Sequence, residues 1–300
     1  MNYSNISTLV KQMLLKIHDD IYKKINQNYI DVFLCGGVSS SRNISVRDII
    51  RKELEKKKGI RILYPEELFM EILNKDKESD LLSLEKFLAD NCDIICIICE
   101  SAGSLVELGA FTNNDATVGK VIAVIEEKRK KDKSFIMLGP IKVIERINNR
   151  NVFFYNKNKV EDLSNELSRE IKLRRFRGVI KIETEQNKPL NTILGLYYIL
   201  PLMLYFFKSL EYIELTNYLK YLFKIKGYDD SDFEWLFRSS LKLLYKDRYI
   251  YKTTVKEKTF YSLTQKGYNN IYNVLYSIDI NNRTLLYDSI RLGIIKSAYY

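Results

Sequence analysis

The chain has 300 residues and a mass of 35.4 kDa, about twice a typical domain of roughly 150 residues, which predicts two domains. With 46% apolar and 29% charged residues, it has the composition of a globular protein with a sizeable core, which excludes a disordered or collagen-like chain. His18 is the single histidine, so counting excludes a Ser-His-Asp triad, a Cys-His dyad or a multi-histidine metal site elsewhere in the chain.

The net charge of +10 is not shared evenly along the chain. Residues 1–150 contain 24 basic and 22 acidic residues, a net charge of +2, whereas residues 151–300 contain 24 and 16, a net charge of +8. Tyrosine is divided in the same way, with 4 in the first half and 18 in the second. The two halves therefore have the character of different domains.

The first half alternates between helical and strand-like patterns. Helices are expected at 8–28, 45–58, 81–91, from 105 onward and at 161–172, and strands at 29–34, 60–64, 93–99, 120–125 and 153–155. This order predicts an α/β fold with a doubly wound, Rossmann-like parallel sheet, in which ligands bind at the carboxyl ends of the strands. We expect this domain to span residues 1–160, followed by a helical linker at 161–189. The charge run at 126–133 is expected to be a solvated loop, with a phosphate or nucleic-acid contact as the alternative.

The remaining residues, 190–300, predict a mostly helical domain with a hairpin. Ser231 and Glu234 match a capping box at the start of a helix, and Thr264 caps a last helix. Between these helices, two strands are expected at 248–253 and 259–263. Three helices, a basic two-stranded hairpin and another helix are the order of a winged-helix domain, a common nucleic-acid binder.

Cysteine usage and hydropathy indicate the compartment. The cysteines lack a histidine or a second Cys-x-x-Cys pair that would complete a zinc site, so reduced core thiols and no metal are expected at Cys35, Cys92, Cys96 and Cys99. The polar N-terminus predicts no signal peptide and hence a cytoplasmic location. Segment 189–207 is uncharged and about as long as a membrane span, but Pro201 interrupts it, so a buried helix is favoured over a transmembrane span.

Two glycine turns follow strands of the predicted sheet. At Cys35, Gly36 and Gly37, the missing Cβ atoms let backbone N–H groups approach a phosphate or ribose, although a plain tight turn is an equal explanation. At the second turn, Gly103 and Ser104 begin a helix whose amides and hydroxyl can hold an anionic or sugar oxygen.

Glu107 lies within about one helical turn of that second glycine turn, facing the strand-end crevice. A carboxylate there can attack or stabilise C1′ of a ribosyl group as an oxocarbenium ion forms, as in glycosidic cleavage. The alternative is a first-turn glutamate that only complements the helix dipole.

Several motifs, in the same order, resemble the nucleoside deoxyribosyltransferase-like domain of retron-associated antiviral effectors. The matching stretches are 32–37, Ser45 with Arg47, 64–69, 82–85, 100–114, and 133–135 with 139–140. In that family this domain is joined to a C-terminal winged-helix DNA-binding domain, and the resemblance implies the same here. Ala102 stands where the retron relatives usually have proline, and Ser101 where the transferases tend to carry an aspartate, which disfavours efficient base exchange.

The resemblance also implies a function and partners. In that family the effector works with a retron reverse transcriptase and its branched RNA–DNA, and cleaves a nucleotide N-glycosidic bond, with NAD the implicated substrate. The catalytic glutamate of the family falls on Glu107. The expected substrate-binding residues are Cys35, Gly36, Gly37, Arg47, Tyr64, Glu85, Asp93, Gly103, Ser104 and Asn114. Related transferases build their sites with neighbouring subunits, which implies a homo-oligomer or a larger assembly with the retron complex.

The histidine count favours NAD over a purine nucleoside. A departing purine base is aided by a proton donor, whereas nicotinamide leaves an already cationic NAD and needs none; Glu85, Asp93 or Glu100 could still act as an acid. We therefore expect NAD hydrolysis, with NAD as substrate, no cofactor, and Glu107 as nucleophile or oxocarbenium stabiliser. Two alternatives stay open: a nucleoside deoxyribosyltransferase that exchanges bases, and a non-enzymatic, nucleotide-sensing DNA-binding regulator.

In the second domain, basic residues are interleaved with Tyr245, Tyr249, Tyr251 and Tyr261. Basic side chains neutralise phosphates and aromatic faces stack on unpaired bases, so this stripe suits an RNA–DNA hybrid or a single strand. The alternative is that the tyrosines fill a core and the lysines solvate it. The expected nucleic-acid contacts are Lys242, Lys246, Arg248, Lys252, Lys256, Lys258 and Lys266.

Overall fold

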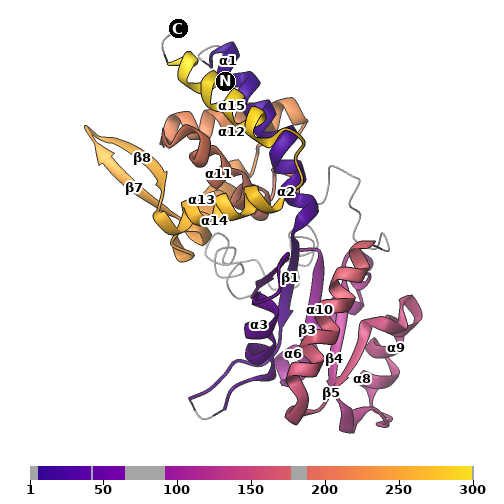
Figure 1. Ribbon diagram of the computed structural model, residues 1–300. Helices are drawn as coiled ribbons and strands as arrows, with labels where there is room; N and C mark the ends of the chain where they lie inside the picture. The colour runs from indigo at the N-terminus through magenta and orange to yellow at the C-terminus, as the bar shows by residue number, and fades with distance from the viewer. Residues whose placement is uncertain (1–5, 42, 65–91, 177–187, 299–300) are drawn as a thin grey trace. The chain divides into compact units, whose positions relative to one another are not determined.

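A computed structural model describes residues 6–41, 43–64, 92–176 and 188–298. The chain divides into two compact units, shown in Figure 1. The sheet unit comprises residues 29–187, and the helical unit combines residues 1–28 with residues 188–300. These boundaries differ from the expected ones, because the opening helix packs with the C-terminal helices and belongs to their unit.

The sheet unit is built on five parallel strands in the order β2-β1-β3-β4-β5. The strands are β1 (Ile30–Cys35), β2 (Ile60–Leu63), β3 (Ile94–Ile98), β4 (Val121–Glu126) and β5 (Val152–Tyr155). Every residue of β1 and β3 is buried, because these central strands are covered on both faces. The expected α/β class and its parallel sheet are confirmed.

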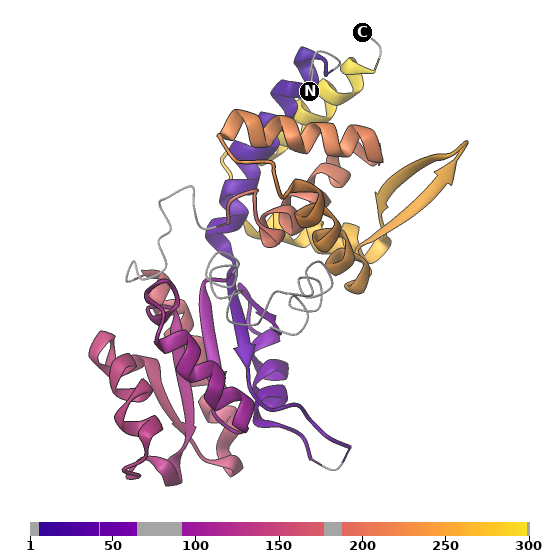
Figure 2. The ribbon, with the colours of Figure 1, turned by 180° about the vertical axis from the view of Figure 1, so that it is seen from behind.

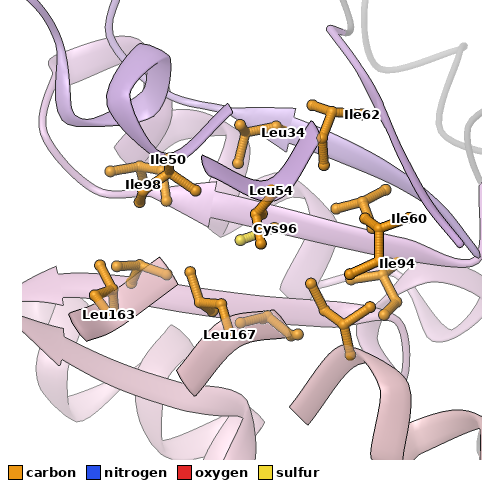
Figure 3. Packing of buried hydrophobic residues seen from close by; sticks show 14 of the residues in the cluster. Leu34, Ile50, Leu54, Ile60, Ile62, Ile94, Cys96, Ile98, Leu163 and Leu167 are labelled. Atoms are coloured by element: carbon orange, nitrogen blue, oxygen red, sulfur yellow. The ribbon is translucent and has the colours of Figure 1, made fainter. Parts of the chain in front are cut away.

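Helices cover both faces of the sheet. One face packs against α3 (Val46–Glu55) and α10 (Val160–Phe176), the other against α6 (Ala102–Thr112) and α9 (Pro140–Ile147). Figure 3 shows the first of these cores, where Leu54 of α3 and Leu163 of α10 belong to the same cluster as Cys96 of β3. Helix α10 is therefore part of the core of the sheet unit, where a linker was expected at 161–189.

Short elements connect the main ones in the sheet unit. They are α7 (Asp115–Val118), α8 (Phe135–Leu138) and single 3-10 turns at Glu127–Arg129, Asn149–Asn151 and Lys157–Lys159. The helix expected at 81–91 lies outside the described residues.

In the helical unit, α11 (Ile193–Phe207) is buried over its whole length except for the last residue. The other helices of the unit are α1 (Thr8–Lys16), a π-helical stretch (Ile17–Tyr22), α2 (Lys23–Asn28), α12 (Tyr212–Lys226), α13 (Phe233–Lys246), α14 (Gln265–Ser277) and α15 (Arg283–Ser297). The uncharged segment around Pro201 is thus a buried core helix, as expected. Within the described ranges, no helix is both long enough and apolar enough to cross a membrane.

A three-stranded antiparallel sheet completes the helical unit. Its strands are β6 (Ser209–Glu211), β7 (Ile250–Val255) and β8 (Lys258–Leu263), in the order β6-β8-β7. Lys256 and Glu257 form the hairpin turn with φ values of 47° and 65°, the backbone geometry that matches the twist of two hairpin strands. Figure 2 shows the β7–β8 hairpin projecting from the rest of its unit. The sequence predicted this hairpin and missed β6.

The helix ends of this unit differ from the expectations in two places. The N-cap of α13 is Asp232, and the predicted capping box does not form, because the Ser231 hydroxyl donates to Asp229 at 2.7 Å. Thr264 caps α14 as expected, accepting the backbone N–H of Gly267 at 3.0 Å. However, α14 is not the last helix, since α15 follows it and packs against α1.

An ion pair joins the opening helical segment to α12. The carboxylate of Asp19 accepts hydrogen bonds from the Lys226 ammonium at 2.7 and 3.0 Å, and lies 2.8 Å from His18 Nδ1. Partial burial raises the pKa of Asp19, but the hydrogen bonds from Lys226 and His18 outweigh it and lower the pKa to about 2. Residues 1–28 are thus tied electrostatically to the C-terminal part of the chain.

This ion pair predicts a pH-dependent stability. Because the pKa of Asp19 is below its ordinary value of 3.8, its ionised form stabilises the fold above that pH, and this contribution is lost as the pH falls through about 2. We expect Asp19→Asn to lower the urea midpoint near pH 7 and to lower it clearly less near pH 2.5, where part of the contribution is already lost. Urea titrations followed by circular dichroism at both pH values measure this, with Asp20→Asn at the exposed neighbour as the control. An equal loss at both pH values would contradict the electrostatic origin.

Candidate active site at the carboxyl edge of the sheet

Because the strands are parallel, their carboxyl ends meet at one edge of the sheet, here called the carboxyl edge. The segments that leave this edge carry Gly36 and Gly37 after β1, Tyr64 after β2, and Glu100 after β3. Helix α6, which carries Glu107, starts there as well. The structure therefore brings together most of the site residues that were expected from separate parts of the sequence.

Glu100 holds three segments of this edge together. Its Oε1 accepts the backbone N–H groups of Gly37 at 3.2 Å and Arg47 at 3.1 Å, and its Oε2 accepts that of Val46 at 2.8 Å. Val46 and Arg47 are the first residues of α3, where N–H groups have no partner within the helix and favour a negative charge. The protein's own carboxylate thus occupies the anion-binding position that the first glycine turn was expected to offer to a phosphate.

The two glycines of this turn are required by close packing. A Cβ atom on Gly36 would lie 3.0 Å from Cβ of Arg47 and 3.1 Å from Cβ of Ile98. A Cβ atom on Gly37 would lie 3.1 Å from Cγ of Glu100. The missing side chains of these glycines therefore let the turn pack closely against α3 and Glu100. This agrees with the plain tight turn, one of the two explanations that the sequence left open. Cys35, just before it, is buried at the end of β1.

Arg47 and Tyr64 form a packed pair at the same edge. The Arg47 guanidinium is 3% exposed and lies 4.1 Å from the centre of the Tyr64 ring, and that of Arg51 lies 4.2 Å from it. The hydroxyls of Tyr64 and Ser39 both donate to the Asp48 carboxylate. Burial, reinforced by the hydrogen bond to Asp48, raises the pKa of Tyr64 to about 12, so its hydroxyl keeps its proton near neutral pH.

The start of α6 is closed by a reciprocal cap. Ser101 Oγ accepts the N–H of Ser104 at 3.2 Å, and Ser104 Oγ accepts the N–H of Ser101 at 3.1 Å and donates to its carbonyl at 2.8 Å. Ser104 is buried, so its hydroxyl serves the cap. Gly103 is exposed, and the nearest atom to a Cβ placed on it is Ser101 Oγ at 4.0 Å, which leaves the backbone of this first turn open to a ligand.

Glu107 lies half-buried on the second turn of α6, close to the end of β3. Burial raises the pKa of the neighbouring Cys99 thiol to about 12; the Glu107 carboxylate raises it further, while Arg129 acts in the opposite direction. Glu107 and Arg129 therefore lie within electrostatic range of the same buried thiol. A carboxylate and a cation thus both act on the thiol at the end of β3.

Three residues of this edge were not singled out from the sequence. Glu126 ends β4 opposite Tyr155 of β5, and Arg129 is exposed in the following turn. Burial raises the pKa of Tyr155 to about 12, with further contributions from the charges of Glu100 and Glu126. Arg129 lies within the charge run at 126–133. The sequence could therefore have pointed to it through the alternative expectation that this run contacts a phosphate.

Two expected site residues lie elsewhere. Asp93 precedes β3 and accepts the N–H of Asp31 at 2.8 Å, at the amino ends of the strands, so that about 20 Å of extended chain separates it from Glu100. Asn114 follows the far end of α6, where its Oδ1 accepts the N–H of Ala116 at 2.8 Å and caps α7. Asp93 thus joins the starts of β1 and β3, and Asn114 stabilises a local turn. Glu85 lies outside the described residues.

The expected nucleic-acid contacts are all exposed but do not form one stripe. They are Lys242 and Lys246 on α13, Arg248 after it, Lys252, Lys256 and Lys258 on the hairpin, and Lys266 on α14. In the hairpin register Lys252 is opposite Tyr261 and Lys258 is opposite Val255, so these two lysines project from opposite faces. Lys258 also pairs with Glu211 at 2.9 Å. Tyr261 is buried, as the core interpretation of the tyrosines predicts.

The fold and site define a two-unit protein, in which a parallel α/β sheet with a carboxylate at its carboxyl edge is joined to a helical unit with a small antiparallel sheet. The model of the STM3845 retron effector protein family matches residues 43–252, and the chain belongs to this family. The segment shared with that family includes Glu100, Glu107 and the first half of β7.

Two proteins of Escherichia coli are similar to this chain. "Retron Ec86 putative ribosyltransferase/DNA-binding protein" is 31% identical over 229 residues, which cover 75% of this chain and 74% of that protein. "Retron Ec73 putative ribosyltransferase/DNA-binding protein" is 36% identical over 121 residues, which cover 38% of this chain and 37% of that protein.

The three hydrogen bonds of Glu100 predict its contribution to stability. Glu100→Gln removes the negative charge and replaces one acceptor oxygen by an NH2 group that faces backbone N–H donors. We expect the free energy of unfolding to fall by about 2 kcal/mol, since hydrogen bonds to a charged acceptor contribute roughly 1.5–3 kcal/mol each. Urea denaturation of this variant and of Glu127→Gln, an exposed control, measures the difference. Equal stability of the two variants would contradict the anchoring role.

Proposed function

We propose that the sheet unit of this retron effector cleaves the N-glycosidic bond of NAD and that the helical unit binds the branched RNA–DNA of the retron. The observation that carries the first part is the position of Glu107, half-buried beside the end of the central strand. Next to it, the first turn of α6 is open at Gly103. The names of the two relatives attribute ribosyltransferase and DNA-binding functions to those proteins, which supports both parts.

The proposed reaction breaks the bond between C1′ of the ribose and the nicotinamide nitrogen. The bonding electron pair stays on that nitrogen, which neutralises the pyridinium and releases nicotinamide. The Glu107 carboxylate stabilises the positive charge that develops at C1′, or adds to C1′ as a nucleophile. Water then supplies the oxygen that ends on C1′ and gives up one proton, so the products are nicotinamide, ADP-ribose and H⁺.

The surroundings of the other carboxylates support a leaving group that needs no acid. Glu100 accepts three backbone N–H groups and so is committed to holding α3 and the glycine turn. Asp93 belongs to the opposite edge of the sheet. Two of the three acids that could have protonated a purine are thereby disfavoured. Since nicotinamide departs from a cation, this arrangement favours NAD over base exchange on nucleosides.

The proposal predicts that Glu107→Gln abolishes most NAD cleavage. We expect the rate of nicotinamide release to fall at least about a hundredfold, because the variant lacks the charge that stabilises the transition state. Chromatography of reactions with NAD and with deoxynucleosides measures the products, using purified protein alone and with the reverse transcriptase and its RNA–DNA. Glu145→Gln, at an exposed glutamate of α9, is the matched control. Nicotinamide release at the wild-type rate by a folded Glu107→Gln variant would refute the assignment, and base exchange would favour the transferase alternative.

The order of elements in the helical unit supports the second part of the proposal. A central helix α11, strand β6, helices α12 and α13, and the β8–β7 hairpin follow one another as in a winged-helix domain. Lys252 and Lys256 are exposed on the projecting hairpin, and Lys242 and Lys246 are exposed on α13. These cations can neutralise backbone phosphates of a nucleic acid.

The hairpin charges predict salt-dependent binding. We expect the double variant Lys252→Gln/Lys256→Gln to weaken binding of an RNA–DNA hybrid and to reduce the slope of log K against log salt by about two. Fluorescence anisotropy at several salt concentrations measures both quantities. Lys258→Gln, whose charge already pairs with Glu211, should change the slope less. An unchanged slope in the double variant would argue against the hairpin as a phosphate contact.

A further inference from the structure

Four tyrosines of the helical unit form two contacting ring pairs, together called here the tyrosine ladder: Tyr205 with Tyr268, and Tyr272 with Tyr276. Tyr205 comes from α11, and the other three lie four residues apart on one face of α14. The ring centres of Tyr205 and Tyr268 are 5.2 Å apart and stacked, and those of Tyr272 and Tyr276 are also 5.2 Å apart. The neighbouring Tyr276 raises the pKa of Tyr272.

The ladder runs from the core to the surface. Tyr205 is 3% exposed, and Arg291 donates to its hydroxyl at 3.1 Å, which fixes the buried end. Exposure then rises along α14, from 36% at Tyr268 to 44% at Tyr272 and 63% at Tyr276. Three adjacent aromatic rings on one exposed helix face are more than the scattered apolar residues of an ordinary surface and mark an interaction site.

Cationic side chains lie close to the rings of the ladder. The Lys208 ammonium lies 5.2 Å from the ring centre of Tyr205 and 5.4 Å from that of Tyr268, and the Arg283 guanidinium lies 5.0 Å from that of Tyr276. Lys208 has a φ of 70°, a conformation that side-chain-bearing residues rarely adopt. The surrounding structure therefore holds its backbone in this unfavourable conformation. Residues 258–278 contain no aspartate or glutamate, so α14 presents no acidic group to a ligand.

We propose that the tyrosine ladder binds unpaired nucleotides of a single-stranded nucleic acid, with bases stacked on the exposed rings. Aromatic faces stack on any base, and nearby cations contact the phosphates of the strand. The ring centres of Tyr272 and Tyr276 are 5.2 Å apart, whereas stacked bases of a duplex strand are only about 3.4 Å apart. The spacing therefore fits an unstacked, unpaired strand. Asn269 and Asn273, exposed beside the rings, add amide donors and acceptors that can reach base edges.

This surface is separate from the two sites proposed above. It uses no residue of the carboxyl edge, so it does not depend on NAD cleavage. It also uses none of the seven basic residues assigned to the winged-helix contacts. Its binding mode differs as well, since the hairpin lysines act through charge and the ladder acts through stacking.

The test compares single strands with a duplex on the full chain. Fluorescence anisotropy measures the Kd of fluorescein-labelled oligo-dT and oligo-rU of about 12 nucleotides and of a blunt DNA duplex of the same length. We expect Tyr272→Ala/Tyr276→Ala to raise the Kd of a single strand at least about tenfold, and that of the duplex less than about twofold. Tyr272→Phe/Tyr276→Phe keeps the rings and should bind within about twofold of wild type. Comparison of oligo-dT with oligo-rU shows which type of strand is preferred.

Controls separate this inference from the others. Ile225→Ala removes an exposed apolar side chain of α12 and should leave single-strand binding unchanged. Lys252→Gln/Lys256→Gln tests the hairpin alone, so the ladder variant and the hairpin variant can succeed or fail independently. Single-strand binding that survives loss of both rings, or an equal loss of single-strand and duplex binding, would overturn the proposal. Binding of the ladder to a protein in place of any oligonucleotide would overturn it too.

Discussion

The arrangement of the carboxyl edge depends on the three hydrogen bonds that Glu100 accepts. The first N–H groups of α3 and the N–H of Gly37 converge on one point, where a negative charge is favoured. Glu100 supplies that charge from the end of the central strand and ties β1, α3 and β3 together. Because the chain continues directly into the Ser101 cap and α6, the same anchor sets the direction of the helix that carries Glu107.

The two glutamates that follow β3 therefore lie in different surroundings, which favour different chemical roles. Glu100 is committed to backbone donors, whereas Glu107 lies within electrostatic range of the buried Cys99 thiol and near the open first turn of α6. We propose that Glu100 holds the edge together and that Glu107 acts on the substrate. In many active sites, two carboxylates have different roles because their surroundings differ. In the proposed reaction, one carboxylate without a histidine would be enough for a pyridinium leaving group.

The sequence predicted the parallel sheet because continuous runs of apolar residues identify buried strands. It predicted the hairpin from runs in which the residue character alternates as in a strand. It could not predict the role of Glu100, because that carboxylate's partners lie 53 to 63 residues earlier and meet it only through strand order. Asp93 could have been excluded, since a residue that precedes a parallel strand belongs to the opposite edge. The placement of residues 1–28 with the C-terminal helices depended on long-range pairs such as Asp19 with Lys226, which no local pattern reveals.

The central claim is that NAD binds at the carboxyl edge with its reacting carbon beside Glu107. A crystal structure of the Glu107→Gln variant with bound NAD tests it most directly, because the substitution is expected to preserve the fold and to prevent turnover. We expect the nicotinamide ribose at the open start of α6, with C1′ about 3–3.5 Å from the side chain at position 107. NAD bound elsewhere, or at this edge with its C1′ turned away from position 107, would refute the proposed role of Glu107.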